Sequence, residues 1–487
     1  MTLMLEDPSL LRMQAYIDGN WTAADSGETL EVTNPATGAV IARVARCGQA
    51  ETRRAIEAAE KAQKDWAART AKERAALLSK LFELMMANQN DLACILTAEQ
   101  GKPLAEARGE IAYSANFLAW FAEEGKRVYG DTIPTFARDK RIVVIKQPIG
   151  VVACITPWNF PSAMLGRKIG PALAAGCAVV CKPANNTPLS AFAIAALAER
   201  AGFPPGVINM VAGVTQEIGD ELCFNPAVRK LTFTGSTPVG KQLMSKCAQT
   251  VKRTSMELGG NAPFIVFDDA DLDAAVAGAI ASKYRNAGQT CVCANRLLVQ
   301  DHVYDNFVGK LAEAVGKFKV GSGVESGVTI GPLIDLKAVE KVEEHVNDAV
   351  KKGAKVVMGG KRHALGGTFY EPTILSNVDT QMAVTREETF GPVAPIFRFK
   401  SEDDAVRMAN DTEFGLAAYF YARDVGRVFR VAEQLEYGIV GINEGIISTE
   451  VAPFGGVKES GLGREGSKYG IEDYLEVKYL NFGGIGA

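Results

Sequence analysis

The pattern of hydrophobic and polar positions changes along the chain. Residues 50–126 place apolar residues at three- and four-residue spacing, in "ETRRAIEAAEKAQKDWAART" and "KERAALLSKLFELMMANQNDLACILTAEQG". This spacing predicts two amphipathic helices, the second ending at Gly101 and Pro103. The later stretch "KRIVVIKQPIGVVACITP" is rich in β-branched residues and is interrupted by Pro148 and Gly150. It predicts two strands that meet at a turn.

Short β-rich runs alternate with helical segments from residue 151 to 257. The runs are "VVACIT", "AVVCK", "VINMV", "KLTFT" and "RTSMEL", with helices expected near residues 163–175, 187–201, 215–223 and 236–249. This alternation predicts the α/β class, with a parallel sheet covered on both faces and ligands beyond the carboxyl ends of its strands. The pattern resumes at "GGNAPFIVF" and continues to about residue 440. The tail "YGIEDYLEVKYL" alternates like an exposed strand.

Composition limits the classes of function. The chain has 487 residues, enough for two or three domains, and a net charge of −4, which argues against a nucleic-acid partner or an acidic membrane surface. The N-terminal stretch has no signal-like apolar core, and the longest apolar run, "IGPALAAGCAVVC", is too short to span a bilayer. Nine scattered cysteines predict a reduced, cytoplasmic protein. The three histidines, at positions 302, 345 and 363, are not at metal-binding spacing, so we expect no metal site.

Two glycine motifs resemble nucleotide-binding loops. The first, Gly461-x-Gly463-x-x-Gly466, follows no clear strand and has no acid at the required distance, so we interpret it as a loop. The second, "GSTPVGK" at residues 235–241, follows "KLTFT" and opens a helix, but Gln242 replaces the hydroxyl that would bind Mg²⁺. Its helix N-terminus could bind a phosphate, or it could be a simple turn with Ser236 as N-cap.

Five stretches together resemble the aldehyde dehydrogenase superfamily over nearly the whole chain. They are "TPWNFP" (156–161), "CKPANNTP" (181–188), "MELGGNAP" (256–263), "GQTCVC" (288–293) and "EETFGP" (387–392). "GQTCVC" and the C-terminal segment are most similar to the succinate-semialdehyde dehydrogenase branch. The resemblance implies a Rossmann-type cofactor domain (1–130 and 150–257), an α/β catalytic domain (258–470) and an oligomerisation element (131–149 and 471–487). It also implies a homo-oligomer, either a dimer or a tetramer.

The resemblance places three catalytic residues, and each suits the chemistry. Oxidation of an aldehyde by hydride transfer needs a tetrahedral adduct, and a thiolate can form one; Cys291 matches the family nucleophile. Asn159 and the Cys291 backbone N–H match the donors that stabilise the oxyanion. Glu257 matches the general base, a role that is consistent with the scarcity of histidine.

Other matched positions imply the cofactor site. Lys182 matches the residue that holds the adenosine ribose. Members that prefer NAD often carry Glu three positions later, where this chain has Asn185, so no carboxylate repels a 2′-phosphate and we expect NADP, with NAD tolerated. Gly235 and Ser236 match the pyrophosphate turn. Glu388 matches the residue that binds the nicotinamide ribose and Phe390 the aromatic residue that lines that pocket, and Trp158 matches a further cofactor-binding position.

Substrate choice is expected to depend on three further positions. Arg167, Arg285 and Ser448 match residues that bind the distal carboxylate in the succinate-semialdehyde branch, and arginine suits this task because its planar fork binds carboxylate bidentately. The alternative is that each arginine pairs with a protein acid. The expected reaction is oxidation of a short ω-carboxylated aldehyde, succinate semialdehyde to succinate, through a thiohemiacetal and a thioester.

Several alternatives stay open at this point. Glutarate semialdehyde and 2-oxoglutarate semialdehyde carry the same carboxylate, and one methylene changes binding by only about 1 to 3 kcal/mol. Two further alternatives belong to other classes of protein: a phosphate-loop nucleotide hydrolase and a non-catalytic relative. Cys293 is either a buried hydrophobe or a thiol that captures an oxidised Cys291 in a regulatory disulfide.

Overall fold

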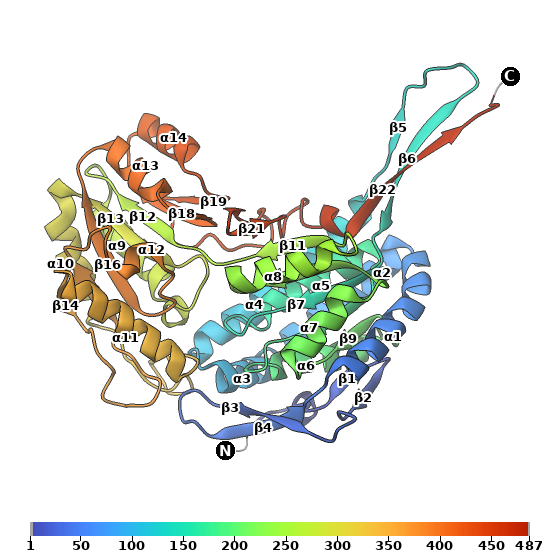
Figure 1. Ribbon diagram of the computed structural model, residues 1–487, viewed down its shortest axis with the longest axis horizontal. Helices are drawn as coiled ribbons and strands as arrows, with labels where there is room; N and C mark the ends of the chain where they lie inside the picture. Colours follow the sequence, from blue (N-terminus) through green and yellow to red (C-terminus); the bar gives the residue numbers. More distant parts are fainter. Residues whose placement is uncertain (1–2, 486–487) are drawn as a thin grey trace.

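The computed structural model describes residues 3–485, which form two α/β domains and a thin projecting sheet (Figure 1). An eight-stranded sheet is the centre of the first domain. Its five middle strands, which are β9, β8, β7, β10 and β11 in spatial order, are parallel, as the alternation of strands and helices predicted. In spatial order the strands are β2 (Asn20–Thr22), β1 (Ala15–Ile17), β9 (Ile208–Met210), β8 (Val179–Lys182), β7 (Val151–Ile155), β10 (Val228–Thr234), β11 (Arg253–Glu257) and β21 (Gly461–Leu462).

Helices cover both faces of this sheet, and each face has its own hydrophobic core. One core packs the sheet against α2 (Ala71–Ala87), α3 (Gln89–Gln100), α4 (Leu104–Glu124), α5 (Ala163–Ala175) and α6 (Leu189–Ala201). The other packs it against α1 (Gln49–Ala68), α7 (Thr215–Phe224) and α8 (Thr237–Ala248). Two covered faces explain why the strands read as continuous apolar runs without a polar alternation.

The prediction of one helix up to Gly101 is wrong at Asn88, where α2 ends and α3 begins. Asn88 leaves helical geometry at φ −106° and ψ 20°, and its side-chain Nδ2 donates to the Leu84 carbonyl at 2.8 Å. A short amide side chain can satisfy a helix-end carbonyl in this way, so the chain turns without a glycine. Gly101 then ends α3 in the left-handed region at φ 98°.

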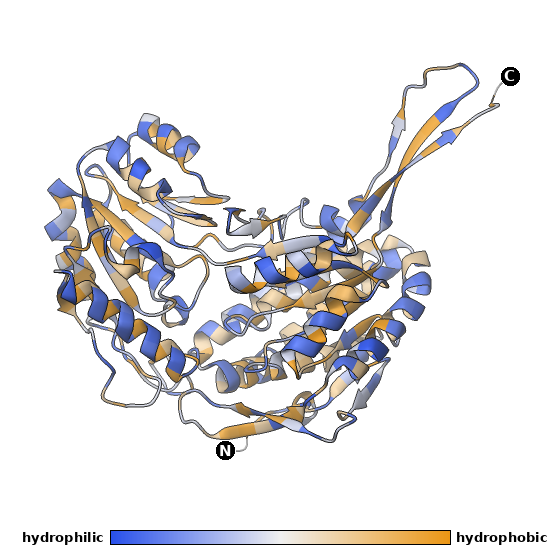
Figure 2. Ribbon diagram, in the orientation of Figure 1, coloured by the Kyte–Doolittle hydropathy of each residue, from blue (hydrophilic) through white to orange (hydrophobic). Residues whose placement is uncertain are grey.

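A seven-stranded sheet is the centre of the second domain, and its strands from β15 to β19 are parallel. In spatial order it contains β14 (Lys355–Met358), β15 (Thr373–Ser376), β16 (Val393–Phe399), β13 (Ala294–Gln300), β12 (Ala262–Val266), β18 (Ala417–Tyr421) and β19 (Ile439–Ile442). Its helices are α9 (Leu272–Lys283), α10 (Tyr304–Val315), α11 (Leu336–Lys351), α12 (Ala383–Arg386), α13 (Glu402–Asn410) and α14 (Val425–Gln434). Figure 2 shows hydrophobic strands inside and largely hydrophilic outer helices.

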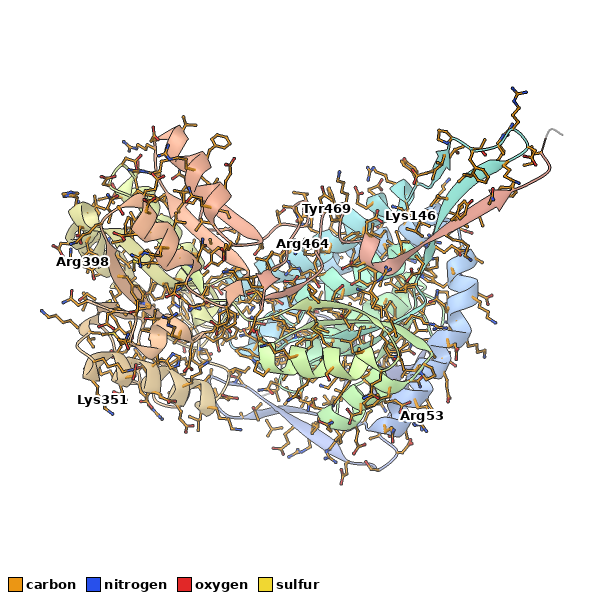
Figure 3. The ribbon with its side chains drawn as sticks, turned by 45° about the horizontal axis from the view of Figure 1, so that its top comes forward. Arg53, Lys146, Lys351, Arg398, Arg464 and Tyr469 are labelled. Atoms are coloured by element: carbon orange, nitrogen blue, oxygen red, sulfur yellow. The ribbon has the colours of Figure 1, made fainter. Side chains whose placement is uncertain are left out.

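Three antiparallel strands project away from the first domain: β5 (Asp131–Ile133), β6 (Arg141–Pro148) and β22 (Leu475–Phe482). The two strands expected around Pro148 and Gly150 are β6 and β7, and they lie in different sheets. Figure 3 places Lys146 on this projecting sheet and Arg464 between the two domains. Two shorter pairs complete the fold: β3 (Thr29–Thr33) with β4 (Val40–Ala45), and β17 (Phe414–Gly415) with β20 (Val457–Lys458).

The glycine motifs have different structures. Gly461 lies in the two-residue strand β21, which pairs with β11, and no α-helix follows it within the described residues. A side chain at Gly461 would collide with the carbonyl oxygen of Met256, so this motif lets two strands approach closely. The segment 235–241 does join a strand, β10, to a helix, α8.

Candidate active site

A cleft of about 290 Å³ lies between the two domains, and ten of the predicted site residues line it. The first domain contributes loops that follow the carboxyl ends of β7 and β10, where a parallel sheet presents its ligands. The second contributes the loops before β13 and before β16. The predicted residues that line the cleft are Trp158, Asn159, Arg167, Gly235, Ser236, Arg285, Cys291, Glu388, Phe390 and Ser448.

The Cys291 loop is held in an unusual backbone conformation. Asn286 and Ala287, five and four residues before the cysteine, have φ values of 52° and 54°. Such left-handed conformations cost about 1–3 kcal/mol for residues other than glycine and persist only where the surroundings hold them. The Asn286 side chain supplies that hold by donating to the carbonyls of Asn159 at 2.9 Å and Gln289 at 3.2 Å.

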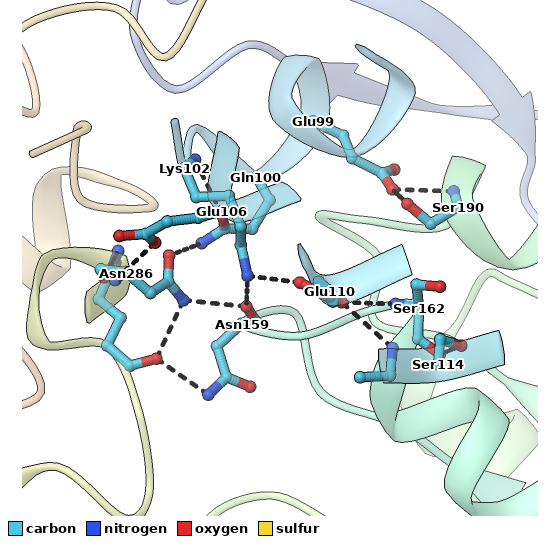
Figure 4. A network of polar contacts seen from close by, with 12 residues as sticks. Glu99, Gln100, Lys102, Glu106, Glu110, Ser114, Asn159, Ser162, Ser190 and Asn286 are labelled. Carbon is cyan, nitrogen blue, oxygen red and sulfur yellow. Dashed lines mark hydrogen bonds and ion pairs between the residues drawn. The ribbon is translucent and has the colours of Figure 1, made fainter. Parts of the chain in front are cut away.

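A buried polar network connects this loop to the Asn159 loop (Figure 4). Lys102 Nζ donates to the Asn159 carbonyl at 2.7 Å and to Glu110 Oε2 at 2.5 Å. Gln100 Nε2 donates to Asn286 Oδ1 at 3.0 Å. Both loops are therefore held by neighbouring residues at the junction of α3 and α4, so the first domain fixes their relative position.

The Asn159 amide faces the cysteine loop. Its Nδ2 donates to the Gln289 carbonyl at 3.0 Å, two residues before Cys291. That bond uses one of the two N–H groups of the amide, so the other remains available in the cleft. An amide fixed in this manner beside a thiol can stabilise an oxyanion that forms on a carbonyl bound to the sulfur.

The Cys291 thiol needs a base before it can react. Although Cys291 is partly open to the cleft, burial in its loop raises its pKa to about 12, and the charges of Glu388 and Glu257 act in the same direction. Arg167 and Arg285 oppose the increase. At neutral pH the sulfur therefore carries its proton until a carboxylate accepts it.

Glu257 has the properties of such a base, although it lies beside the cleft and does not line it. It is the last residue of β11, it is buried, and its Oε2 has no hydrogen-bond partner within residues 3–485. Burial raises its pKa well above the usual value, and the neighbouring Glu465 adds to this effect. Arg167 and Lys168 oppose it. A carboxyl with a raised pKa is suited to exchange protons near neutral pH.

The two arginines differ in their protein contacts. Arg167 is 1% exposed, its Nε lies 3.2 Å from Glu465 Oε2, and its guanidinium stacks 3.7 Å from the Phe454 ring centroid. Its Nη2 nevertheless has no partner in the described chain. Arg285, in the second domain, makes no ion pair within the described residues, and its guanidinium lies over the Phe160 ring. The alternative that each arginine pairs with a protein acid therefore applies only to the Nε edge of Arg167.

The cofactor end of the cleft contains aromatic and charged groups. The rings of Trp158 and Phe390 meet edge to face with centroids 5.5 Å apart. Glu388 Oε1 accepts from the Gly260 N–H at 3.4 Å, and burial raises the Glu388 pKa to about 7. Ser236 occupies the N-cap of α8, but its side chain makes no capping bond within the described chain. The N–H groups in the first turn of α8 therefore donate no hydrogen bond to the Ser236 side chain and can bind a pyrophosphate.

Lys182 and Asn185 lie farther along the same sheet edge, outside the cleft lining. Lys182 is buried at the end of β8, and burial lowers its pKa to about 8. An anionic partner would relieve this cost, so the site fits the phosphate-bearing ribose of a dinucleotide. Asn185 Nδ2 donates to the Gly213 carbonyl at 2.8 Å. Its amide therefore shapes the loop and adds no negative charge.

Of the cleft-lining residues that were not predicted, four are aromatic or charged. They come from α4, from the residue after Asn159, from α11 and from the segment before β20, and periodicity alone marks them as ordinary helix or loop positions. Lys341 Nζ donates to the Glu388 carbonyl at 2.6 Å. The four are Tyr113, Phe160, Lys341 and Phe454.

Cys293 lies outside the cleft. It is fully buried, and its Sγ donates to the Lys283 carbonyl at 3.2 Å. Burial raises the pKa of this thiol too. The packing is that of a buried hydrophobe, while the regulatory disulfide with Cys291 stays a hypothesis.

The structure thus places a parallel α/β domain opposite a cysteine-bearing α/β domain across one cleft. Comparison with known proteins specifies the class: the model of the aldehyde dehydrogenase family matches residues 21–480. The chain is 69% identical to glutarate-semialdehyde dehydrogenase of Pseudomonas aeruginosa, covering 99% of this chain and 100% of that protein. It is 65% identical to the NADP(+) succinate-semialdehyde dehydrogenase GabD of Escherichia coli, with coverage of 99% and 100%.

A solved structure agrees with these relatives. The crystal structure of an NADP-dependent enzyme of E. coli superposes with a TM-score of 0.98 at 65% identity, covering 99% of this chain and all of that one. The chain belongs to the aldehyde dehydrogenase family, and its predicted fold is confirmed. It is an aldehyde dehydrogenase.

Family membership excludes the nucleotide-hydrolase alternative, and the contacts of Lys241 agree. This residue corresponds to the lysine of a phosphate loop, but its Nζ pairs with Glu459 at 2.7 Å. Within residues 3–485 there is no group of three or more His, Cys, Asp or Glu side chains suited to a metal ion. In the same part of the chain, no helix is both long and apolar enough to cross a bilayer.

Proposed function

We propose that this enzyme oxidises a short ω-carboxylated aldehyde, succinate semialdehyde to succinate, with NADP⁺ as cofactor and NAD⁺ tolerated. The observation that carries the proposal is the placement of Arg167, Arg285 and Ser448 in one cleft with Cys291. Two arginines that face one cavity with unpaired N–H groups favour a carboxylate ligand. The name of the E. coli relative supports the same substrate and cofactor.

The proposed reaction begins with proton transfer from Cys291 to Glu257. The thiolate attacks the aldehyde carbon, and the Asn159 amide and the Cys291 N–H stabilise the oxyanion of the thiohemiacetal. The bound nicotinamide supplies the hydride acceptor. Glu257 releases the thiol proton to solvent before the next step. It then accepts a proton from the water that opens the resulting thioester and passes it to the departing sulfur, which regenerates the thiol, and the product acid ionises to a carboxylate.

The cofactor preference follows from the charges around Lys182. Asn185 presents no carboxylate, so nothing at that position repels a 2′-phosphate, and Lys182 provides a buried cation for it. We assign cofactor binding to residues 1–130 and 150–257 and the reactive cysteine to the catalytic domain, 258–470. The first-turn N–H groups after Ser236 would hold the pyrophosphate, and Glu388 would hold the nicotinamide ribose.

Glutarate semialdehyde is the second candidate substrate, because the P. aeruginosa relative named for it is 69% identical to this chain. It carries the same carboxylate on one more methylene. The expected difference between the two in kcat/KM is therefore about 10- to 200-fold, in either direction.

The test is a panel of kcat/KM values for C3 to C6 semialdehydes and their uncharged analogues, with each cofactor. We expect succinate semialdehyde to exceed butanal by roughly 10- to 100-fold, because unpaired arginines penalise a substrate without the carboxylate. Equal values for the charged and uncharged aldehydes would contradict the proposal. A higher value for glutarate semialdehyde would transfer the assignment to the second candidate.

The assembly and compartment are also proposals. The projecting sheet of β5, β6 and β22 exposes apolar side chains that a second copy of the chain would cover. We therefore propose that residues 131–149 and 471–487 form the contact of a homo-oligomer, dimer or tetramer. All nine cysteines are free in the structure. This is the state expected in the reducing cytoplasm.

A further inference from the structure

Tyr113 lines the cleft beside the two arginines, and its buried hydroxyl is not part of the proposed reaction. The residue lies in the middle of α4 and lines the cleft with Arg167 and Arg285. Its hydroxyl oxygen is buried and has no hydrogen-bond partner within residues 3–485. Buried polar groups are paired in most proteins, so an unpaired hydroxyl beside a ligand cavity indicates a partner supplied by the ligand.

The position of the Tyr113 ring is fixed by its neighbours. It packs edge to face against Phe117, one turn along α4, at a centroid distance of 5.0 Å. The Arg167 guanidinium lies over both rings, 5.9 Å from that of Tyr113 and 5.4 Å from that of Phe117. Gly166 lets the two helices approach closely, because a Cβ there would lie 2.6 Å from the Ser114 carbonyl oxygen. Tyr113 and Arg167 are thus held side by side on facing helices.

Each of these two neighbouring residues has an unsatisfied donor. Arg167 Nη2 is buried without a partner, and so is the Tyr113 hydroxyl. A carboxylate has two oxygens with about four acceptor sites, enough for two arginines, a serine and a tyrosine. An aldehyde chain without the carboxylate would leave both donors unpaired.

We propose that the Tyr113 hydroxyl donates a hydrogen bond to the distal carboxylate of the substrate, beside Arg167, and so contributes to substrate specificity. This inference rests on the proposed function, because it requires a substrate with such a carboxylate. Burial also raises the pKa of Tyr113, so the hydroxyl keeps its proton throughout the working pH range. The donor is therefore neutral, unlike the two arginines.

The test is Tyr113→Phe, which removes the hydroxyl and keeps the ring between Phe117 and Arg167. We expect kcat/KM for succinate semialdehyde to fall about 10- to 100-fold, as for loss of a hydrogen bond to a charged group. The value for butanal should stay within about twofold. Thermal unfolding should not shift downward, because no bond within the protein is lost.

Tyr370→Phe is the matched control. The Tyr370 hydroxyl is also buried and unpartnered in the described structure, but the residue does not line the cleft. This variant should leave kcat/KM unchanged for both succinate semialdehyde and butanal. A Tyr113→Phe enzyme that keeps its preference for succinate semialdehyde, or that loses both activities equally, would overturn the inference while the proposed function stands. A wild-type enzyme without that preference would instead overturn the proposed function and the inference with it.

Discussion

Four buried charged residues lie together beside the cleft, and their balance sets the chemistry of single side chains. Glu465 pairs with Lys168 at 2.6 Å and with Arg167 at 3.2 Å, so its charge is compensated. Glu257 has no such partner, and the negative charge of Glu465 raises its pKa further. In a group of two acids and two bases, the unpaired carboxyl is the one that can change its protonation state during turnover.

The first prediction concerns Glu257. Because burial raises its pKa, the base form accumulates only as pH rises, so kcat in wild type should increase with pH along a limb that lies above the usual pKa of glutamate, about 4.3. Glu257→Gln should slow NADPH formation in the first turnover, since Cys291 loses its base, and should lower steady turnover by roughly 100-fold or more, since the water that opens the thioester loses its base too. Stopped-flow absorbance at several pH values measures both effects.

Asp268→Asn serves as a control for loss of a carboxylate, since this residue pairs with Arg427 outside the cleft. It should leave the pH profile unchanged. Steady turnover at the wild-type rate in Glu257→Gln would remove Glu257 from the mechanism.

At the scale of elements, the start of α4 positions two loops that the chain places far apart. Lys102 and Glu110 form a fully buried ion pair, and Lys102 also bonds the Asn159 carbonyl. Glu110 in turn accepts from the N–H groups of Ser162 and Ala163 at the start of α5. The Asn159 loop is thus held at its middle and at its C-terminal end by side chains of the α3–α4 region.

The second prediction concerns this pair. Lys102→Met leaves Glu110 without a counter-charge in the interior and should lower the free energy of unfolding by about 3–5 kcal/mol. It should also lower kcat, since the Asn159 carbonyl loses the hydrogen bond from Lys102 that positions its loop. Chemical denaturation and steady-state kinetics measure the two effects.

Lys126→Met is the matched control, because Lys126 pairs with Glu123 at the exposed end of α4 and should matter little. Adding Glu110→Gln to Lys102→Met should restore part of the stability, since no lone charge then remains. Full stability in Lys102→Met alone would show that the pair does not hold this region.

At the scale of the whole molecule, the projecting sheet has too little protein around it to bury its own side chains. On β22, Val477 and Tyr479 are 66% and 56% exposed, and Phe136 near β5 is 73% exposed. Figure 2 shows hydrophobic stretches along this extension between hydrophilic ones. A three-stranded sheet with apolar residues in solvent is expected to be covered by another chain.

The third prediction follows. Val477→Asp places a charge in the proposed interface and should shift the protein to a smaller species in light scattering coupled to size-exclusion chromatography. Val350→Asp is the control, because this exposed valine lies on α11 in the second domain. An unchanged mass for Val477→Asp, or the same shift in both variants, would contradict an interface at this sheet.

Much of the architecture could be predicted because periodicity reflects burial. The strands from β7 to β12 and the helices between them appear in the sequence as apolar runs and amphipathic segments, and the structure has them within a few residues. The break at Asn88 could not be predicted in the same way. It depends on one side-chain bond to a helix-end carbonyl, which leaves the hydrophobic spacing almost unchanged.

The sequence by itself determined the kinds of chemical group in this enzyme: one cysteine in a family motif, a glutamate at a strand end, an amide and two arginines. Only the tertiary structure decided which groups meet and how each is charged. Tyr113 shares a cleft with Cys291 although 178 positions separate their numbers, because α4 packs against α5. The pKa of Glu257 and the unpaired edge of Arg167 likewise depend on Glu465, nearly three hundred positions after Arg167. Burial and charge pairing are properties of neighbours in space, and the order of residues does not contain them.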